Sequence, residues 1–558
     1  MGRHSLVPFF CWLLGAVFSV QATIPYTVPW SDQTYGPDGP WHAVTVSLGS
    51  NKQPVDLYPG DRWASTILID TICSNKSLAS TCYAERAGVF NINTSTSAVT
   101  PGPVSWASSG KWSTPGYALQ GVLADTVSFG PDMPNVSIEA IYDAYQTYPD
   151  GTNYPVSVGL LSLGAPKLNH SVVNYTYTFN MVAGWLFSMG GENQIPSYSY
   201  GMHIGAVNPK IPGSLILGGY DQNRVLGDVN SQPVNTAGGL GNLDISLQDI
   251  GIGVAAGGSP WNYTSKSGLL MQGGRSQTVE VDPTKPYLYL PPDACDAIAA
   301  ELPVTFNKSL GLYFWNTSDS QYQDITSSPA YLSFTFVKDS NNTQNLTIKV
   351  PFRLLNLTLQ EPLVQQNKTY FPCFPATNNY YVLGRAFLQA AFIGANWGEG
   401  TGNGQWFLAQ APGPGALQAS SMTTISINQT NVSASASSWE DSWTGYWTPL
   451  PSGTNFSSGT NSSTGGKSSA GGSLSTGAAA GVGVGCGIAG VLLLGAVTWV
   501  VLRGRRVAMA KQPAAAEYPL STAADVPRLQ NQDGAQELHT DKVIHEVEPA
   551  LPVRHELD

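Results

Sequence analysis

Short runs of alternating apolar and polar residues recur along residues 41–411. Residues 43–48 (Ala-Val-Thr-Val-Ser-Leu) and 214–217 (Ser-Leu-Ile-Leu) are examples, and Gly, Pro and Asn turn residues separate such runs. Helical patterns are few, and the clearest covers residues 291–302, where Pro292 and Asp293 open an amphipathic segment. Many short strands between turns predict a mostly β, mainly antiparallel fold that is larger than one sandwich.

Two longer apolar segments lie outside this region. The first, residues 6–20, follows Arg3 and precedes small residues, which is typical of a cleaved signal peptide over residues 1–22. The second, residues 477–502, carries no charge and is long enough to span a bilayer as a helix. Arginines follow it directly, so we expect residues 503–558 to form a disordered cytoplasmic tail.

The segment between the β-rich region and the apolar span is rich in Ser, Thr and Gly. Such a composition buries too little apolar area to fold, so we predict a glycosylated stalk over residues 412–476. Residues 439–447 contain three tryptophans, and an alternative is that they pack on the domain or on the membrane surface.

Charge and composition exclude some functions. The net charge is -11 and only 11 % of the residues are charged, so no basic face for nucleic acid is expected. The seven His residues form no His-Glu-x-x-His motif, and Ser162 lacks the spacing of a nucleophile elbow. We therefore expect no metal, cofactor or nucleic-acid partner, and we expect a monomer.

Asn-x-Ser/Thr sites are dense on the predicted outer side of the membrane. This density predicts a glycoprotein at the plasma membrane or in another membrane of the secretory pathway, with a cytoplasmic C-terminus. The acceptor asparagines are Asn75, Asn93, Asn135, Asn169, Asn174, Asn262, Asn307, Asn316, Asn341, Asn345, Asn356, Asn367, Asn428, Asn431, Asn455 and Asn461.

Several motifs of the β-rich region occur in the order in which pepsin-like aspartic proteases have them. The region resembles that family, which implies a two-lobed β fold with an N-terminal segment over 23–40 and lobes over 41–220 and 221–411. The lobes are expected to be related by a pseudo-two-fold axis. The motifs are residues 44–49 and 55–58, residues 125–130 (Asp-Thr-Val-Ser-Phe-Gly), residues 159–164 with their second-lobe counterpart 381–388, the interlobe strand 213–221 and the closing strand 407–411.

Of the six cysteines, Cys11 lies in the predicted signal peptide and Cys486 in the predicted membrane span. The other four lie on the outer side of the membrane. Four cysteines allow three connectivities. The short gap within one pair, together with the two lobes that the resemblance implies, favours the disulfides Cys73–Cys82 and Cys295–Cys373.

The resemblance implies one catalytic aspartate per lobe, each in an Asp-Thr/Ser-Gly loop, and the first is missing. Aspartic proteolysis needs two carboxylates that share a proton across a water molecule. Spacing from the first hairpin and back from Cys73 places Gly60 at the first catalytic position. Asp61 could serve only as a substitute, because Arg62 and Trp63 would then occupy the positions of the small hydroxyl residue and the glycine.

The second loop keeps its carboxylate but not its surroundings. Asp282 matches the catalytic position, whereas Pro283 replaces the hydroxyl residue and Thr284 replaces the glycine. Degenerate loops combined with a membrane span resemble a group of fungal pepsin-like surface proteins.

Three functions remain open on this sequence. The leading hypothesis is a non-catalytic binding module whose interlobe cleft holds an extended peptide or a wall ligand. The rival is a divergent aspartic endopeptidase with Asp61 facing Asp282. The third is a structural glycoprotein whose cleft is filled by its own side chains, such as Trp63 and Tyr117.

Overall fold

The computed structural model describes most of the predicted outer part of the chain. Residues 1–22, 172–176, 271–273, 339–343, 417–418 and 453–558 lie outside the described residues. The predicted signal peptide, apolar span and cytoplasmic tail therefore all fall outside them. Among the described residues, no helix is both long and apolar enough to cross a membrane.

The first lobe is built on one large sheet. Its strand β3 shows the expected period of two, since Val46 and Leu48 are buried while Thr45 and Ser47 are only half-buried. In order across the sheet the strands are β11 (Asn169–Ser171), β12 (Thr178–Asn180), β8 (Asp132–Thr147), β5 (Ser65–Leu68), β10 (Gly159–Ser162), β4 (Gln53–Asp61), β3 (Trp41–Leu48), β7 (Gly116–Ser128) and β6 (Ser105–Ser109), with β2 (Trp30–Tyr35) beside β3 and β9 (Asn153–Pro155) beside β8.

The second lobe contains an eight-stranded and a four-stranded sheet. In the larger sheet, Leu332, Phe334 and Phe336 of β23 alternate inward and are fully buried. Its order is β24 (Asn345–Pro351), β23 (Ala330–Val337), β17 (Asp244–Val254), β19 (Gln277–Val281), β28 (Tyr381–Leu383), β20 (Leu288–Leu290) and β27 (Cys373–Pro375), with β18 (Ser265–Lys266) beside β17. The smaller sheet has the order β21 (Val304–Asn307), β22 (Leu312–Trp315), β26 (Lys368–Phe371) and β25 (Leu357–Leu359).

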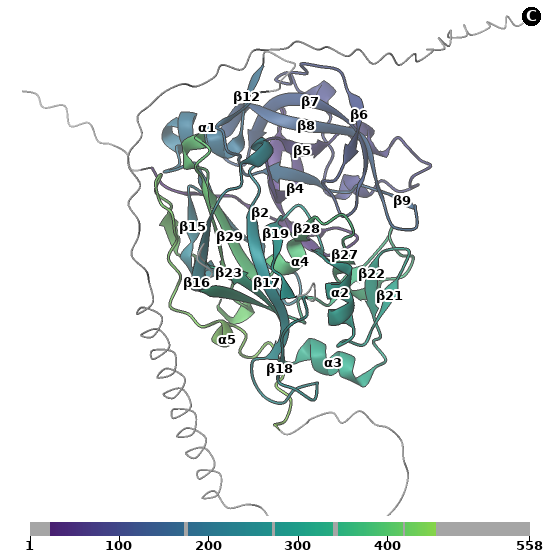
Figure 1. Ribbon diagram of the computed structural model, residues 1–558. Helices are drawn as coiled ribbons and strands as arrows, with labels where there is room; N and C mark the ends of the chain where they lie inside the picture. Colours follow the sequence, from purple (N-terminus) through teal and green to yellow (C-terminus); the bar gives the residue numbers. More distant parts are fainter. Residues whose placement is uncertain (1–22, 172–176, 271–273, 339–343, 417–418, 453–558) are drawn as a thin grey trace, which may run out of the picture. The chain divides into compact units, whose positions relative to one another are not determined.

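A six-stranded sheet draws on distant parts of the sequence, and its strands β16 and β29 lie on the left of the view below helix α1 (Figure 1). It contains β1 (Tyr26–Thr27), β14 (Ser214–Leu217), β13 (Ser199–His203), β29 (Ala391–Asn396), β30 (Gln405–Gln410) and β16 (Leu226–Pro233). The helices are short: α1 (Val182–Met189), α2 (Pro292–Ala299), α3 (Ser320–Ser327), α4 (Arg385–Leu388) and α5 (Trp439–Ser442). The mostly β, two-lobed fold expected from the sequence is confirmed.

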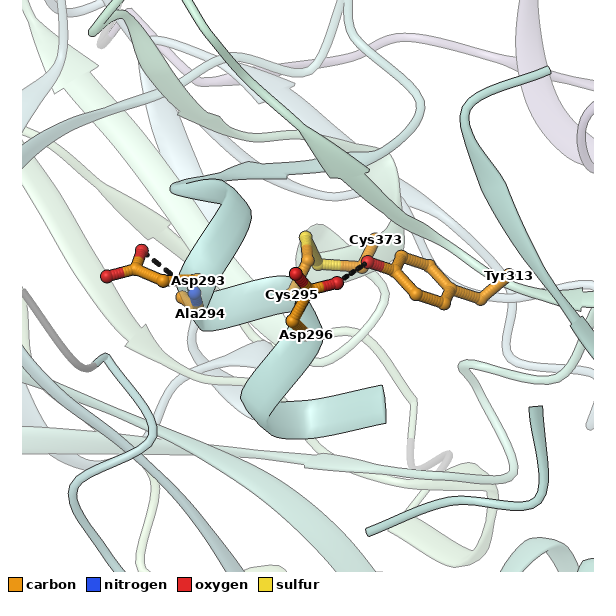
Figure 2. Close-up of a disulfide and its surroundings, with 6 residues drawn as sticks. All are labelled: Asp293, Ala294, Cys295, Asp296, Tyr313 and Cys373. Atoms are coloured by element: carbon orange, nitrogen blue, oxygen red, sulfur yellow. Dashed lines mark hydrogen bonds between the residues drawn. A yellow bond between two sulfur atoms is a disulfide. The ribbon is translucent and has the colours of Figure 1, made fainter. Parts of the chain in front are cut away.

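Both disulfides form with the predicted pairing. Cys73 is bonded to Cys82 within the first lobe, and Cys295 to Cys373 within the second. Figure 2 shows Cys295 on helix α2. The neighbouring Asp296 accepts a hydrogen bond from the Tyr313 hydroxyl. The second disulfide thus fixes helix α2 to strand β27.

The sequon asparagines lie at the surface where they are described. All of them are exposed except Asn307 and Asn356, which are half-buried, and Asn356 donates to the Tyr322 hydroxyl at 2.9 Å. The others are Asn75, Asn93, Asn135, Asn169, Asn262, Asn316, Asn345, Asn367, Asn428 and Asn431, whereas Asn174, Asn341, Asn455 and Asn461 lie outside the described residues.

The stalk prediction is wrong for residues 419–452, which pack on the second lobe. Strand β31 (Met422–Thr424) pairs with β15 (Gly219–Asp221), and the Ile425 side chain that follows it is fully buried. Trp439 and Trp443 belong to the main apolar core. The alternative that the tryptophan-rich segment packs on the domain is therefore correct, and a stalk can begin no earlier than residue 453.

Candidate functional site

Two parallel strand pairs, one in each lobe, position the two active-site loops. In the first lobe Pro59 of β4 pairs with Leu161 of β10, and in the second Val281 of β19 pairs with Leu383 of β28. The residues that follow, Gly60 and Asp282, thus occupy equivalent places at the ends of β4 and β19. The two loops meet where the lobes face each other.

Gly60 leaves no room for a side chain. Its φ is 127°, a backbone conformation that residues with a Cβ rarely adopt. A Cβ built on Gly60 would lie 2.0 Å from Cγ of Pro283, far inside van der Waals contact. The proline of the second loop therefore occupies the volume into which a side chain at the first position would project.

Asp61 turns its carboxylate into its own lobe. One oxygen accepts from the backbone N–H of Arg62 at 2.8 Å, and the other accepts from Thr66 at 2.8 Å and from the Lys111 ammonium at 3.1 Å. Lys111 also forms an ion pair with Glu139 at 2.5 Å. Burial lowers the pKa of Lys111, but the two carboxylates outweigh burial and leave the pKa raised. Asp61 is thus held by a charged lysine.

Asp282 caps its own loop. Its Oδ1 accepts from the backbone N–H of Thr284 at 2.9 Å and from the Thr284 hydroxyl at 2.7 Å, and only 7 % of the residue is exposed. Within the part of the chain that the structure describes, no hydrogen bond joins the carboxylates of Asp61 and Asp282, and they share no donor. Each carboxylate is thus held by partners of its own loop or lobe.

An ion pair joins the lobes at this place. The Arg62 guanidinium, from the first loop, lies 2.5 Å from the carboxylate of Glu280 on β19, and the Tyr380 hydroxyl donates to the other oxygen of that carboxylate. Burial raises the pKa of Glu280 to about 7, and Asp282 adds to the rise, although Arg62 opposes it. Burial lowers the pKa of Arg62, but Glu280 and Asp282 outweigh it, so the pKa remains above its usual range.

Arg385 supports the second loop from behind. Its guanidinium donates to the carbonyls of Pro283 at 3.0 Å and Thr284 at 2.8 Å. The guanidinium lies over the rings of Trp41 and Tyr58, at 5.1 and 4.2 Å from their centroids. Arg385 lies in the motif 381–388, but the sequence predicts no role for it in the site, because its partners come from three distant segments.

The β6–β7 hairpin bends over the site, and its tip, residues 110–115, is bonded to the opposite lobe. Lys285 donates to the Trp112 carbonyl at 3.0 Å, and the Tyr289 hydroxyl donates to the Ser113 carbonyl at 2.5 Å. Burial lowers the pKa of Lys285 to about 8, although Asp282 opposes the shift. The hairpin tip is therefore fixed to the C-terminal lobe through its backbone.

A cavity of about 620 Å³ remains beneath this hairpin. Trp63 lies on its wall and is half-buried, whereas Tyr117 is 50 % exposed and does not line it. The expectation that Trp63 and Tyr117 fill the cleft therefore does not match the arrangement. The cavity wall includes Gly60, Asp61, Arg62, Lys111, Glu139, His170, Asp282, Thr284, Lys285 and Tyr380.

Comparisons with known proteins assign the two-lobed region to a family. Residues 43–401 match the family model described as "Eukaryotic aspartyl protease". The crystal structure of aspartic proteinase from Irpex lacteus is similar at 17% sequence identity and a TM-score of 0.43, covering 69% of this chain and 97% of that one. A search of the curated proteins gives no match. Because the family model spans well over half of its residues, the chain belongs to the eukaryotic aspartyl protease family.

Proposed function

We propose that this chain is a catalytically impaired member of its family that acts as a ligand-binding module on the cell surface. The observation that carries this proposal is the contact between Gly60 and Pro283. The first loop lacks a carboxylate, and the second loop occupies the volume that such a carboxylate would need. A single Asp282 cannot serve as both general base and general acid of a shared-proton pair.

The proposed setting is a single-pass type I membrane glycoprotein with its two lobes outside the cell. The exposed sequon asparagines and the two disulfides support an oxidising, glycosylating compartment. In this proposal the cavity of about 620 Å³ between the lobes takes the ligand, because its size lies within the range of small-molecule and oligomer subsites.

The rival function, a divergent endopeptidase that uses Asp61, has less support. Asp61 would have to release Lys111 and Thr66 and turn toward Asp282. A purely structural glycoprotein without a ligand also has less support, since the cavity is not filled by the side chains expected to fill it.

Activity measurements on the full chain test the proposal. Incubation with a peptide library between pH 3 and pH 7 is expected to give no cleavage above that of the Asp282→Ala variant. Cleavage that pepstatin inhibits and that Asp282→Ala abolishes would show a working dyad and end the proposal.

Gly60→Asp is expected to destabilise the fold rather than create activity. The left-handed backbone costs about 1–2 kcal/mol for a residue with a Cβ, and overpacking against Pro283 costs about 1–3 kcal/mol more. Gly151→Asp is the matched control, because Gly151 has φ 86° and no atom within 4 Å of an added Cβ. Chemical denaturation should place Gly60→Asp below Gly151→Asp, and Pro283→Ala should recover part of the difference. Equal stability of the two aspartate variants would show that Pro283 does not block the position.

A further inference from the structure

The cavity wall carries as many basic as acidic side chains: Arg62, Lys111 and Lys285, and Asp61, Glu139 and Asp282. Lys285 donates to the Trp112 carbonyl and Asp282 accepts from the Thr284 hydroxyl. Lys111 is held by Asp61 and Glu139, and Arg62 is held by Glu280 behind the wall. An ion that bound at Lys111 or Arg62 would have to displace one of these pairs, at the cost of leaving a partly buried charge without its partner. The charge balance therefore favours an uncharged ligand.

The hairpin above the cavity offers few backbone acceptors to a peptide. Peptides that bind as an added strand rely on main-chain hydrogen bonds. The carbonyls of Trp112 and Ser113 at the hairpin tip already accept from Lys285 and Tyr289. A strand-like peptide would compete with these bonds.

Two fixed aromatic rings line the cavity instead. Trp63 has φ 65°, its indole N–H donates to the Gly239 carbonyl at 3.1 Å, and its ring lies 5.6 Å from that of His170. Tyr380 is 46 % exposed, and its hydroxyl is held by Glu280. Trp63 also packs against the main apolar core, so its ring is held in place at the cavity wall in a rarely populated backbone conformation. Such conformations cluster at ligand sites.

The remaining wall supplies uncharged hydrogen-bonding groups. Ser105 and Gln120 line the cavity on the side of β6 and β7. Ser137 of β8 also borders the cavity, but it is 1 % exposed and its hydroxyl is hydrogen-bonded to His170 at 2.7 Å. Hydroxyl and amide groups of this kind bind hydroxyls, while an aromatic face covers the C–H face of a sugar ring.

We propose that the cavity binds a neutral oligosaccharide, with one sugar ring on Trp63 and its hydroxyls on Ser105 and Gln120 of the β6–β7 wall. This inference rests on the proposed non-catalytic function and names the ligand class of the same cavity.

Calorimetric titration of the full chain tests the inference, in a detergent without a sugar headgroup. The probes are soluble hexamers of glucose, of N-acetylglucosamine and of mannose. At least one is expected to bind, and Trp63→Ala is expected to weaken its binding at least tenfold, while Trp63→Phe retains most of the affinity. Trp106→Ala is the matched control, because Trp106 is 52 % exposed on β6 and does not line the cavity.

Three outcomes would overturn the inference: no hexamer binds at millimolar concentration, Trp63→Ala binds as well as the wild-type chain, or Trp106→Ala weakens binding equally. Thermal unfolding of both alanine variants shows whether a loss of binding reflects a loss of folding. If Trp63→Ala does not fold, the affinity of Trp63→Phe tests the inference, and loss of binding by a folded Trp63→Phe would contradict it. If uncleaved peptides bind in a Trp63-dependent manner and the hexamers do not, the oligosaccharide is wrong but the non-catalytic function stands. Cleavage of the peptides would contradict the proposed non-catalytic function.

Discussion

Replacing Trp443 with alanine is expected to lower the free energy of unfolding by about 3–5 kcal/mol, the cost typical of deleting a buried tryptophan. The side chain is 1 % exposed, stacks on Trp447 with centroids 5.6 Å apart, and closely approaches Gly413, where an added Cβ would lie 2.6 Å from its ring. The loss would leave a cavity between the C-terminal segment and the second lobe. Chemical denaturation of the full chain measures the change.

Tyr446→Ala provides the control for this prediction. Tyr446 lies three residues away in the same segment but is 41 % exposed, so its loss should cost much less. Equal and negligible effects of both substitutions would mean that residues 419–452 behave as the stalk that the composition predicts. A large effect of Trp443 alone would show that the folded unit extends beyond the two lobes.

The strands could be predicted from the sequence because their signal is local. The alternation in residues 43–48 and the motif 381–388 each carry a period or spacing that a short window contains. The positions of Gly60 and Asp282 followed from the same spacings, and in the structure they lie at equivalent ends of two parallel strand pairs.

The C-terminal segment was misjudged because its apolar residues are widely spaced. Ile425, Val432, Trp439 and Trp443 stand among Ser, Thr and Asn residues. Ile425 and Val432 are buried in one small apolar cluster, and Trp439 and Trp443 are buried in the main core. Mean composition over the segment hides them, since burial of a few large side chains is enough to order a chain on an existing surface. The cluster of tryptophans was the one available signal.

The interactions around the site could not be predicted, because they join residues far apart in sequence. Arg62 and Glu280 are 218 positions apart, and Arg385 bonds to the second loop from 102 positions away. From the sequence, Arg62 is considered only at the position of the small hydroxyl residue of the first loop, and Glu280 is given no role. Their pairing depends on the packing of two lobes, which no local pattern specifies.

Arg62→Met is expected to destabilise the protein by about 3–5 kcal/mol above pH 7, because it leaves the Glu280 carboxylate buried and unpaired. At pH 5 the cost should be much smaller, since the pKa of Glu280 lies near 7 and its carboxyl group is then already neutral. Lys266→Met is the control. Lys266 pairs with Glu301 at 2.5 Å, but its side chain is 41 % exposed, so its removal should cost about 1 kcal/mol or less.

The sign of the pH dependence follows from the raised pKa. Glu280 binds its proton more tightly in the folded state than in the unfolded state, so its contribution to stability is complete below about pH 4.5 and is lost as the pH rises through about 7. The charged groups that act on it are Arg62, Asp282 and, from the neighbouring strand, Asp244.

Glu280→Gln should flatten the profile of stability against pH between pH 4.5 and pH 7. If this variant keeps the wild-type slope, the titrating group lies elsewhere. The double variant Arg62→Met, Glu280→Gln has no buried carboxylate at position 280. Above pH 7 this double variant should therefore be more stable than Arg62→Met alone.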